Sequence, residues 1–195
     1  YNFKQLFKNL NIKPTTKSDC EIIIHMYIKY GIKHALQYLD GVFAFILFDY
    51  NKNVAYVARD TFGVRPLFYY HMFNQDQMIF SSEIKCISKL LSLQDENHTT
   101  AAVKQFPCGV CYKYKFENSN YYFDNKYVFS HLNSMAITHS FNKNDWQELV
   151  YNALDNAVKK RLMGTTEREV ACLLSGGLDS SLICAIANKY YKQLT

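Results

Sequence analysis

The fold of this chain is decided by residues 42–58, whose sequence is VFAFILFDYNKNVAYVA. The apolar run Val42–Asp49 is followed by a polar turn at residues 51–53 and by a second apolar run, Val54–Ala58. Two apolar runs that flank a short polar turn are typical of an antiparallel β-hairpin. We therefore predict that the chain changes to β-structure from Val42 onwards.

Further strands are predicted on the carboxyl side of this hairpin. The runs Leu67–His71 and Gln77–Ser81 flank another polar turn, so a meander of strands is expected. Weaker strand patterns cover Val110–Phe116 and Tyr121–Tyr127. Both lie within residues 93–144, which are rich in Asn, Ser, Lys and Tyr, and we interpret that region as domain edge and linker.

Helices are predicted on both sides of the strands. Ser18 and Glu21 have the spacing of a capping box, in which serine and glutamate side chains accept hydrogen bonds from the first free amides of a helix. Gly31 is a natural left-handed stop for that helix. A second short helix is expected at Lys33–Leu39, and another at Glu83–Leu91.

A long helix is predicted from Asp145 to about Met163, with Asn144 as its cap and Gly164 at its end. Its apolar positions recur with helical spacing and should share one face. They are Trp146, Leu149, Val150, Ala153, Ala157 and Val158.

Composition indicates a folded protein with a buried core. The chain has 195 residues, of which 49% are hydrophobic and 20% charged, as in ordinary globular domains. Its longest apolar run, residues 42–48, is far shorter than the roughly 20 residues of a membrane-spanning helix. The amino end has no signal-peptide pattern. We expect no membrane partner.

Charge and cysteine content favour a cytoplasmic protein that binds no nucleic acid. The net charge is +5, but the lysines are spread along the chain instead of forming a basic patch. Six cysteines are too scattered for a disulfide framework, so reduced thiols are expected. Cys108 and Cys111 form a single C-x-x-C pair, which supplies only half of a zinc shell, and we predict no metal there.

The most specific motif is Leu173–Ser181, which reads LLSGGLDSS. It lies between a predicted strand, Val170–Leu174, and a predicted helix, Ser181–Tyr191. Paired glycines let a backbone approach an anion, and the amides at a helix start can donate hydrogen bonds to it. Asp179 cannot attract phosphate itself, so its expected role is to hold Mg²⁺. The patterns of P-loop and dinucleotide-binding proteins are absent from the sequence.

Ser-Gly-Gly-x-Asp-Ser resembles the pyrophosphate loop of ATP pyrophosphatase enzymes. Four upstream motifs stand in the order and spacing of class II glutamine amidotransferases. They are TKSDCE at 16–21, LDGVFAF at 39–45, ARDTFGVRPL at 58–67 and SSEIK at 81–85. With Arg161-Leu162-Met163 and the loop that follows, the set resembles the asparagine synthetase family over nearly the whole chain.

This resemblance implies a mixed fold of the α+β and α/β classes. Residues 1–130 would be a partial αββα glutaminase domain of the N-terminal-nucleophile type. Residues 131–195 would begin an adenine-nucleotide α/β domain with its first β-α unit. The implied substrates are glutamine, aspartate and ATP, the implied cofactor is Mg²⁺, and a homodimer is one assembly that the resemblance allows.

Site residues follow from the same resemblance. Asp19 would contact the bound glutamine, or else would only support the helix dipole. Arg59 and Asp60 are expected to fix a turn between strands. The remaining assignments concern ATP: Leu174 at the adenine, Ser175, Gly176, Gly177 and Ser180 at the phosphates, and Asp179 toward Mg²⁺-pyrophosphate.

The chain departs from the family at the glutaminase nucleophile. Class II glutaminases use an N-terminal cysteine, whereas residue 1 here is Tyr1. In the family an Asn-Gly-Glu segment that stabilises the oxyanion directly precedes a Tyr-Asn pair, so we expect a fragment that begins just after it. No catalytic residue of the glutaminase is therefore assigned.

Two other interpretations remain open from the sequence. A related amide-forming synthetase could act on a carboxylate other than aspartate, and a non-catalytic regulatory relative could keep only this core. Flanking coding sequence with a Met-Cys-Gly start and a downstream Ser-Gly-Glu-Gly-Ser-Asp-like loop would favour the enzyme.

We predict that the 195-residue chain by itself releases no ammonia from glutamine, because the nucleophile and its oxyanion donors are not in the sequence. Ammonia would be measured against a heat-inactivated sample. Release above that sample would contradict the assignment.

Overall fold

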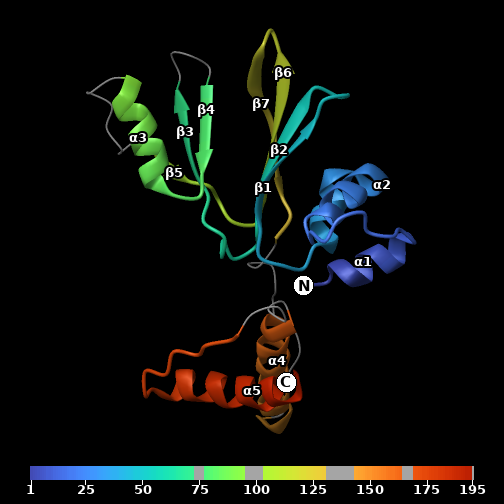
Figure 1. Ribbon diagram of the computed structural model, residues 1–195, viewed down its shortest axis with the longest axis vertical. Helices are drawn as coiled ribbons and strands as arrows, with labels where there is room; N and C mark the ends of the chain where they lie inside the picture. Colours follow the sequence, from blue (N-terminus) through green and yellow to red (C-terminus); the bar gives the residue numbers. More distant parts are fainter. Residues whose placement is uncertain (73–76, 95–102, 131–142, 164–168, 195) are drawn as a thin grey trace. The chain divides into compact units, whose positions relative to one another are not determined.

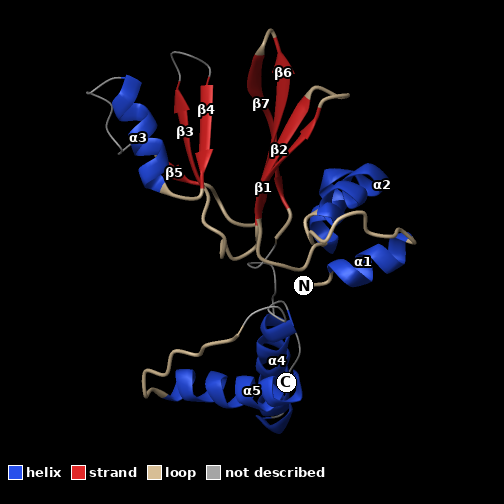
Figure 2. Cartoon of the chain, viewed as in Figure 1, coloured by secondary structure: helices blue, strands red, loops and turns tan. Residues whose placement is uncertain are grey.

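The computed structural model describes residues 1–72, 77–94, 103–130, 143–163 and 169–194 (Figure 1). The chain divides into two compact units, of which one spans Asn2–Met135 and the other contains Ala136–Thr195. The first unit holds all the strands of the described residues, and the second is helical (Figure 2).

Two antiparallel sheets form the centre of the first unit. The larger sheet has the strand order β1-β2-β6-β7 and the smaller one the order β4-β3-β5. The larger sheet consists of β1 (Ala44–Asp49), β2 (Val54–Arg59), β6 (Val110–Glu117) and β7 (Asn120–Val128). The smaller sheet consists of β3 (Phe68–Met72), β4 (Gln77–Ser81) and β5 (Lys104–Gln105).

Helices cover the outer faces of the two sheets. Helix α2 (Glu21–Tyr38) packs on the larger sheet, and α3 (Ile84–Gln94) packs on the smaller one. Figure 1 shows the resulting sequence of layers, from α2 through both sheets to α3. A short helix, α1 (Phe3–Leu10), lies against α2. The predicted αββα arrangement of this unit is confirmed.

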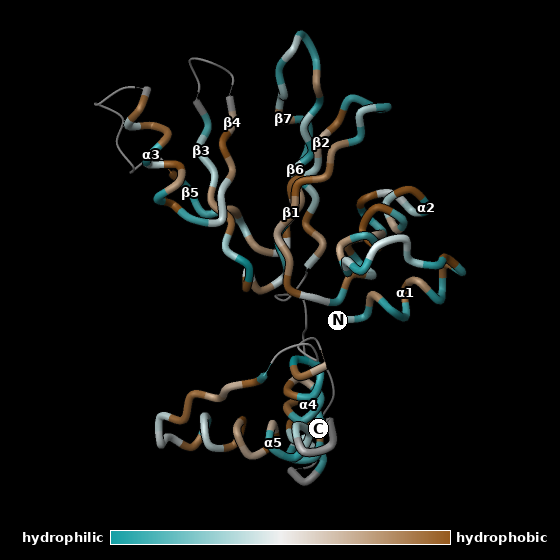
Figure 3. Tube along the Cα trace, viewed as in Figure 1, coloured by the Kyte–Doolittle hydropathy of each residue, from teal (hydrophilic) through white to brown (hydrophobic). Residues whose placement is uncertain are grey.

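Strand β2 contributes to the core through both of its faces, which is why all six of its residues are buried. Val54, Tyr56 and Ala58 join the cluster under α2, whereas Ala55 and Val57 join the cluster between the sheets. Successive side chains of a strand point to opposite faces, so an uninterrupted apolar run suits a strand that is covered twice. In Figure 3 this strand is correspondingly among the hydrophobic parts of the trace.

The predicted hairpin is confirmed. Strands β1 and β2 pair antiparallel, with Ala44 opposite Arg59 and Asp49 opposite Val54. The strands at 67–71 and 77–81 also form an antiparallel pair, shifted by one residue at the start. The polar turn predicted between these two strands, at residues 74–76, lies outside the described residues.

The strands predicted at 110–116 and 121–127 are confirmed as β6 and β7, whereas the interpretation of this region as domain edge and linker is wrong for β6. Strand β6 is an inner strand of the larger sheet, paired with β2 on one side and β7 on the other. Val110 is buried, and Cys111 and Tyr114 belong to the core clusters on the two sides of the sheet. The sequence pattern is weak because Lys113 and Lys115 alternate with aromatic residues, and their partners lie on other strands.

Two helix starts also differ from the predictions. Glu21 is the first residue of α2, and its carboxylate does not accept from the Ser18 amide, so no capping box forms. Helix α4 (Lys143–Met163) already includes Asn144, which therefore is not its cap. Gly31 does interrupt α2, with φ +74°, and the predicted second helical segment follows it.

Helix α1 was not predicted, although its signal is in the sequence. Phe3, Leu6, Phe7 and Leu10 recur at helical spacing. The last three are buried against Ile22, Met26 and Ala35 of α2.

The second unit is a pair of packed helices, α4 and α5 (Leu178–Leu194). Val158 and Leu162 of α4 pack against Ile186 and Ala187 of α5. This contact lies further along α4 than predicted, because Trp146, Leu149 and Val150 are exposed. Gly164, the predicted helix end, is outside the described residues.

The predicted strand Val170–Leu174 is not a strand in the structure. These residues have no regular secondary structure, and no described segment pairs with them. A strand exists only where a neighbour completes its backbone hydrogen bonds, so the apolar run alone does not form one. The helix that follows begins at Leu178, three residues before the predicted start.

A buried pair of charged residues fixes the loop after β2. The guanidinium of Arg59 donates to three backbone carbonyls, at 2.8 Å to Arg65, 2.7 Å to Phe106 and 2.6 Å to Gly63. The Asp60 carboxylate accepts from four backbone amides, at 2.9–3.2 Å. Those amides belong to Phe43, Phe62, Val64 and Arg65. The structural role predicted for both residues agrees with these contacts.

We predict that Asp60→Asn lowers the free energy of unfolding of the first unit by about 2–4 kcal/mol, since a buried donor that loses a charged acceptor costs about that much. Urea unfolding would be followed by the near-ultraviolet circular dichroism of the tyrosines. Glu83→Gln, which removes an exposed ion pair with Lys85, should change stability by less than about 1 kcal/mol.

The single tryptophan, Trp146, lies in α4 and reports on the second unit. The unfolding transition that Trp146 fluorescence reports should occur at the same urea concentration in the Asp60→Asn variant as in the parent chain. An unchanged tyrosine transition would contradict the role given to Asp60.

Candidate functional site

The Ser-Gly-Gly loop forms a tight turn at the start of α5. Gly176 has φ +83°, a conformation that favours glycine, and nothing lies within 4 Å of where its Cβ would be. The hydroxyls of Ser175 and Ser180 lie 2.9 Å apart and join the two ends of the turn. The Ser181 amide donates to the Gly177 carbonyl at 3.1 Å and begins the helical hydrogen bonding.

This loop presents its polar groups to solvent. Residues 171–179 are exposed, and Ser180 is half-buried. The first-turn amides of a helix have no acceptor within the helix, and the helix dipole adds partial positive charge there. Asp179 lies in that first turn. The arrangement can bind an anion, provided that a cation offsets the Asp179 carboxylate.

Three leucines around the loop are unusually exposed. Leu173, Leu174 and Leu178 expose 94%, 65% and 83% of their surface. An apolar rim beside polar donors suits a ligand that has both an apolar ring and charged groups. The structure thus brings together all the residues predicted to bind ATP, in one exposed turn.

Asp19 lies in the other compact unit, in a turn directly before α2. Its side chain is exposed. A carboxylate near a helix start supports the helix dipole, and an exposed one can also pair with a ligand's ammonium group.

Glu21 anchors the loop that carries Asp19. Its carboxylate accepts from the Thr15 amide at 2.8 Å, and from the Thr16 amide and hydroxyl at 2.6 Å each. It also lies 3.2 Å from the His25 ring nitrogen, and that ring packs edge-on against Phe7 of α1. The capping-box pattern does not predict this positioning role, because in the structure the carboxylate accepts from Thr15 and Thr16. The signal available in the sequence was the adjacent pair Thr15 and Thr16, which can donate to a carboxylate at Glu21.

These hydrogen bonds lower the pKa of Glu21 to about 2, and the largest contribution is the Thr15 amide. The ordinary value for glutamate is about 4.3. Because the folded-state pKa is the lower one, the carboxylate stabilises the folded loop above about pH 4.3. That contribution is lost as the pH falls toward 2.

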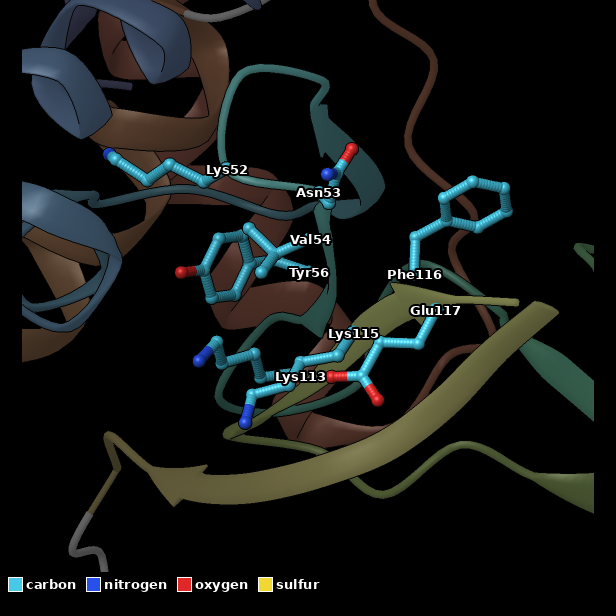
Figure 4. Close-up of a pocket in the computed structure, with 8 residues that line it drawn as sticks. All are labelled: Lys52, Asn53, Val54, Tyr56, Lys113, Lys115, Phe116 and Glu117. Atoms are coloured by element: carbon cyan, nitrogen blue, oxygen red, sulfur yellow. The ribbon is translucent and has the colours of Figure 1, made fainter. Parts of the chain in front are cut away.

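A surface hollow of about 460 Å³ lies on the larger sheet (Figure 4). Figure 4 shows Lys113 and Lys115 pointing to the same side of β6. Both pair with Asp124, at 2.7 and 3.1 Å, and Lys52 pairs with Asp49 at 3.2 Å. Lys113 and Lys115 share the single Asp124 carboxylate, which offsets one of their two positive charges.

Tyrosines beside the hollow do not add a titrating group near neutral pH. Burial raises the pKa of Tyr56 to about 12. Burial and the hydrogen bond to Asp49 raise the pKa of Tyr27 to about 12 as well.

An irregularity in β7 explains how Asp124 reaches both Lys113 and Lys115. Lys113 pairs with Asn125 and Tyr114 pairs with Phe123, so Asp124 is the extra residue between them.

Cys108 and Cys111 differ in environment. Cys108 is exposed, whereas Cys111 is buried in the core cluster beneath α2. Burial raises the pKa of Cys111 to about 12, which opposes the thiolate that a metal needs. Among the described residues, no group of three or more His, Cys, Asp or Glu side chains could hold a metal ion.

Comparisons with known proteins agree with this geometry. The sequence profile of the glutamine amidotransferase domain matches residues 1–142, and that of asparagine synthase matches residues 149–195. A solved glutamine phosphoribosylpyrophosphate amidotransferase from B. subtilis superposes with a TM-score of 0.50 at 24% identity. It covers 66% of this chain and 27% of its own, and it supports the fold only.

Sequence relatives match almost the whole chain. The glutamine-hydrolysing asparagine synthetase of Homo sapiens is 36% identical over 204 residues, and that of Gallus gallus is 34% identical over 206. A probable asparagine synthetase of Acanthamoeba polyphaga mimivirus is 32% identical over 197 residues. These alignments include 97–100% of this chain. The chain spans 35–36% of the length of these relatives.

Two antiparallel sheets between helices, together with these matches, define the class as an αββα domain of the N-terminal-nucleophile type. The glutamine amidotransferase profile matches more than half of the residues. The chain belongs to the glutamine amidotransferase family, and over nearly its full length it is similar to glutamine-hydrolysing asparagine synthetases.

Within the part of the chain that the structure describes, no helix is both long enough and apolar enough to cross a membrane.

We predict that Thr16→Val raises the pKa of Glu21 above about 2, because the hydroxyl donor is lost. The carboxyl chemical shift of Glu21 would be followed by NMR as a function of pH. Thr15→Val is the matched control, since Thr15 contributes only its backbone amide, which valine retains. Equal shifts in both variants, or none in Thr16→Val, would overturn the anchoring role of the Thr16 hydroxyl.

Proposed function

We propose that this chain is part of a glutamine-dependent asparagine synthetase. In that reaction, glutamine hydrolysis supplies ammonia, and ATP activates the side-chain carboxylate of aspartate for amidation. The products are asparagine, glutamate, AMP and pyrophosphate. The observation that carries the proposal is the order of parts in one chain: an αββα unit followed by an exposed Ser-Gly-Gly-Leu-Asp-Ser turn at a helix start.

The proposed division of labour follows the two parts of the sequence. Residues 1–130 form the glutamine amidotransferase domain, and residues 131–195 begin the ATP-binding synthetase domain. Because each contains its own candidate site residues, the two half-reactions should respond to different substitutions.

Asp19 is the proposed contact for the ammonium group of glutamine. The support for this role is its exposed carboxylate on a loop that is held at Thr15 and Thr16 by Glu21. A carboxylate–ammonium pair is a charge-assisted hydrogen bond, stronger than a neutral one. A fixed loop reduces the entropy lost when the substrate binds.

The turn at the start of α5 is the proposed ATP site. Ser175, Gly176, Gly177 and Ser180 would contact the phosphates through backbone amides and hydroxyls, and the exposed Leu174 would lie at the adenine. Open space around Gly176 leaves room for phosphate next to the backbone. The first-turn amides of α5 would supply further donors.

Mg²⁺ fits the donor set of this turn. The cation is usually held by one or two carboxylates together with substrate phosphates and water. Asp179 offers one exposed carboxylate beside the amides that would receive the phosphates. When bound, Mg²⁺ would neutralise charge on the phosphate oxygens. Asp179 is accordingly proposed to hold the cation through pyrophosphate.

The proposal also covers location and assembly. A cytoplasmic enzyme is consistent with the lack of any membrane-spanning helix in the described residues. A homodimer of the full-length protein is proposed from the family resemblance.

We predict that two substitutions in the full-length protein separate the half-reactions. Asp19→Asn should lower kcat/KM for glutamine about 10- to 150-fold, from the loss of about 1.5–3 kcal/mol, while synthesis from added ammonia is retained. Asp179→Asn should lower pyrophosphate release by several orders of magnitude with either nitrogen source, while glutamine hydrolysis is retained.

Both activities would be measured on the same preparations, with asparagine quantified as the product. Pyrophosphate release at the parent rate in Asp179→Asn would refute the role of Asp179 in holding the cation. An unchanged kcat/KM for glutamine in Asp19→Asn would refute the role of Asp19 in binding glutamine. Formation of a different amide would show that the acceptor is a carboxylate other than aspartate.

A further inference from the structure

A chain of hydrogen bonds runs from Glu21 to Asp19 through the loop that precedes α2. Residues 13–20 of this loop are all exposed, whereas the Glu21 side chain exposes only 10% of its surface. A segment that buries little apolar surface depends on its hydrogen bonds for a defined conformation. The position of the Asp19 carboxylate therefore depends on the contacts that reach it from Glu21.

The hydroxyl of Thr16 lies at the centre of this chain. It donates to Oε2 of Glu21 at 2.6 Å and accepts from the Ser18 amide at 3.2 Å. A threonine hydroxyl has one hydrogen to donate and two lone pairs that accept, so both contacts can exist at once. Thr16 thus connects the carboxylate at the start of α2 to the backbone of the loop.

The contacts continue from Ser18 to Asp19. The Ser18 hydroxyl accepts from the Cys20 amide at 3.2 Å, and the Ser18 carbonyl accepts from the Glu21 amide at 3.4 Å. The Cys20 thiol is a weak donor, and its sulfur lies 3.7 Å from Oδ1 of Asp19. Both neighbours of Asp19 are therefore held, and one of them contacts its carboxylate.

Glu21 itself is fixed on its other side by α2. Its Oε1 atom accepts from the Thr15 amide at 2.8 Å and lies 3.2 Å from Nε2 of His25, one helical turn further along. Since Oε2 is bonded to Thr16, both oxygens of the carboxylate have partners. The carboxylate thus holds one orientation, to which the loop is attached.

We propose that Thr16 is a positioning residue for glutamine: its hydroxyl transmits the fixed orientation of Glu21 to the loop, so that the Asp19 carboxylate meets the ammonium group of the substrate. The inference rests on the proposed function, because it takes Asp19 as the glutamine contact. It adds to that function a residue that acts on the substrate only through Asp19.

Loss of the Thr16 hydroxyl has a definite kinetic consequence. Without it, the loop can adopt other conformations, and only a fraction of the molecules has Asp19 in the binding position. The apparent dissociation constant rises as that fraction falls. The ammonium group is remote from the amide that reacts, so this contact is equally strong in the ground state and in the transition state. KM for glutamine should therefore rise while kcat is kept.

The test measures glutamine hydrolysis by the full-length protein with two substitutions at one position. Thr16→Val removes the hydroxyl and keeps the branched shape, whereas Thr16→Ser keeps the hydroxyl and serves as the matched control. Thr16→Val should raise KM for glutamine about 2- to 10-fold, as expected for one hydrogen bond. Its kcat, and the KM of Thr16→Ser, should stay within about twofold of the parent.

A double-mutant cycle shows whether Thr16 acts through Asp19. In the Asp19→Asn background, Thr16→Val should cause no further rise in KM, because the carboxylate that it positions is absent. A purely structural role would instead reduce the amount of active protein, which lowers kcat in both backgrounds and leaves KM unchanged. Glu21→Gln provides a second variant, since a carboxamide has one acceptor oxygen where the carboxylate has two, and it should also raise KM.

Three results would overturn the inference while leaving the proposed function intact. They are an unchanged KM in Thr16→Val, an equal rise in Thr16→Ser, and the same fold-increase from Thr16→Val with and without Asp19. A full-length parent that hydrolyses no glutamine would overturn the proposed function, and this inference would fall with it. Synthesis from added ammonia, measured on the same preparations, should be equal in the parent and in the Thr16 variants.

Discussion

The first unit depends on the buried charges of Arg59 and Asp60 at the end of β2. Removing two ionised side chains from water is costly unless nearly all of their hydrogen-bonding groups are satisfied. Here the guanidinium donates to three carbonyls and the carboxylate accepts from four amides. One of those carbonyls belongs to Phe106, 47 residues away and fully buried between the two sheets. The pair therefore holds the loop after β2 and the connection to β6 in one arrangement.

That arrangement also limits which residues can stand in the loop. Gly63 has φ +63°, and a Cβ at this position would lie 2.9 Å from the guanidinium carbon of Arg59. Only glycine meets both conditions. Gly109, at the entrance to β6, donates to the carbonyls of Arg59 and Asp60 at 3.2 and 2.9 Å. These backbone bonds fix the start of β6 against the end of β2 within the larger sheet, and the Arg59 side chain links that sheet to Phe106, which follows β5 of the smaller sheet.

The candidate sites lie on turns that regular elements position. Asp19 precedes α2 on a loop held by Glu21, and the Ser-Gly-Gly turn precedes α5. Exposed loops on a rigid scaffold are where binding residues concentrate in proteins. The Glu21 carboxylate holds the first loop, and the contact between the Ser175 and Ser180 hydroxyls closes the second, where the same two serines are also candidate phosphate contacts.

Local patterns were enough to predict the hairpin of β1 and β2, the interruption at Gly31 and the turn at 175–177, because each depends on neighbours in sequence. The placement of β6 could not be predicted in this way. Its lysines alternate with aromatic residues, and this pattern fits an inner strand only because Asp124 of β7 pairs with the lysines and the opposite sheet covers Tyr114. Likewise, the predicted capping box does not form, because the Glu21 carboxylate accepts hydrogen bonds from Thr15 and Thr16 instead.

The sequence by itself determined the first hairpin and the turn glycines, since strand periodicity and turn chemistry are properties of adjacent residues. Its short motifs also carried the family resemblance that implied the class of fold and the candidate site residues. The tertiary structure alone decided two things. It made β6 an inner strand, and it left residues 170–174 without a partner strand among the described residues. Each of these depends on which distant segment of the chain lies next to the residues concerned. Local sequence patterns do not predict backbone pairing or side-chain contact between segments that are far apart in the sequence.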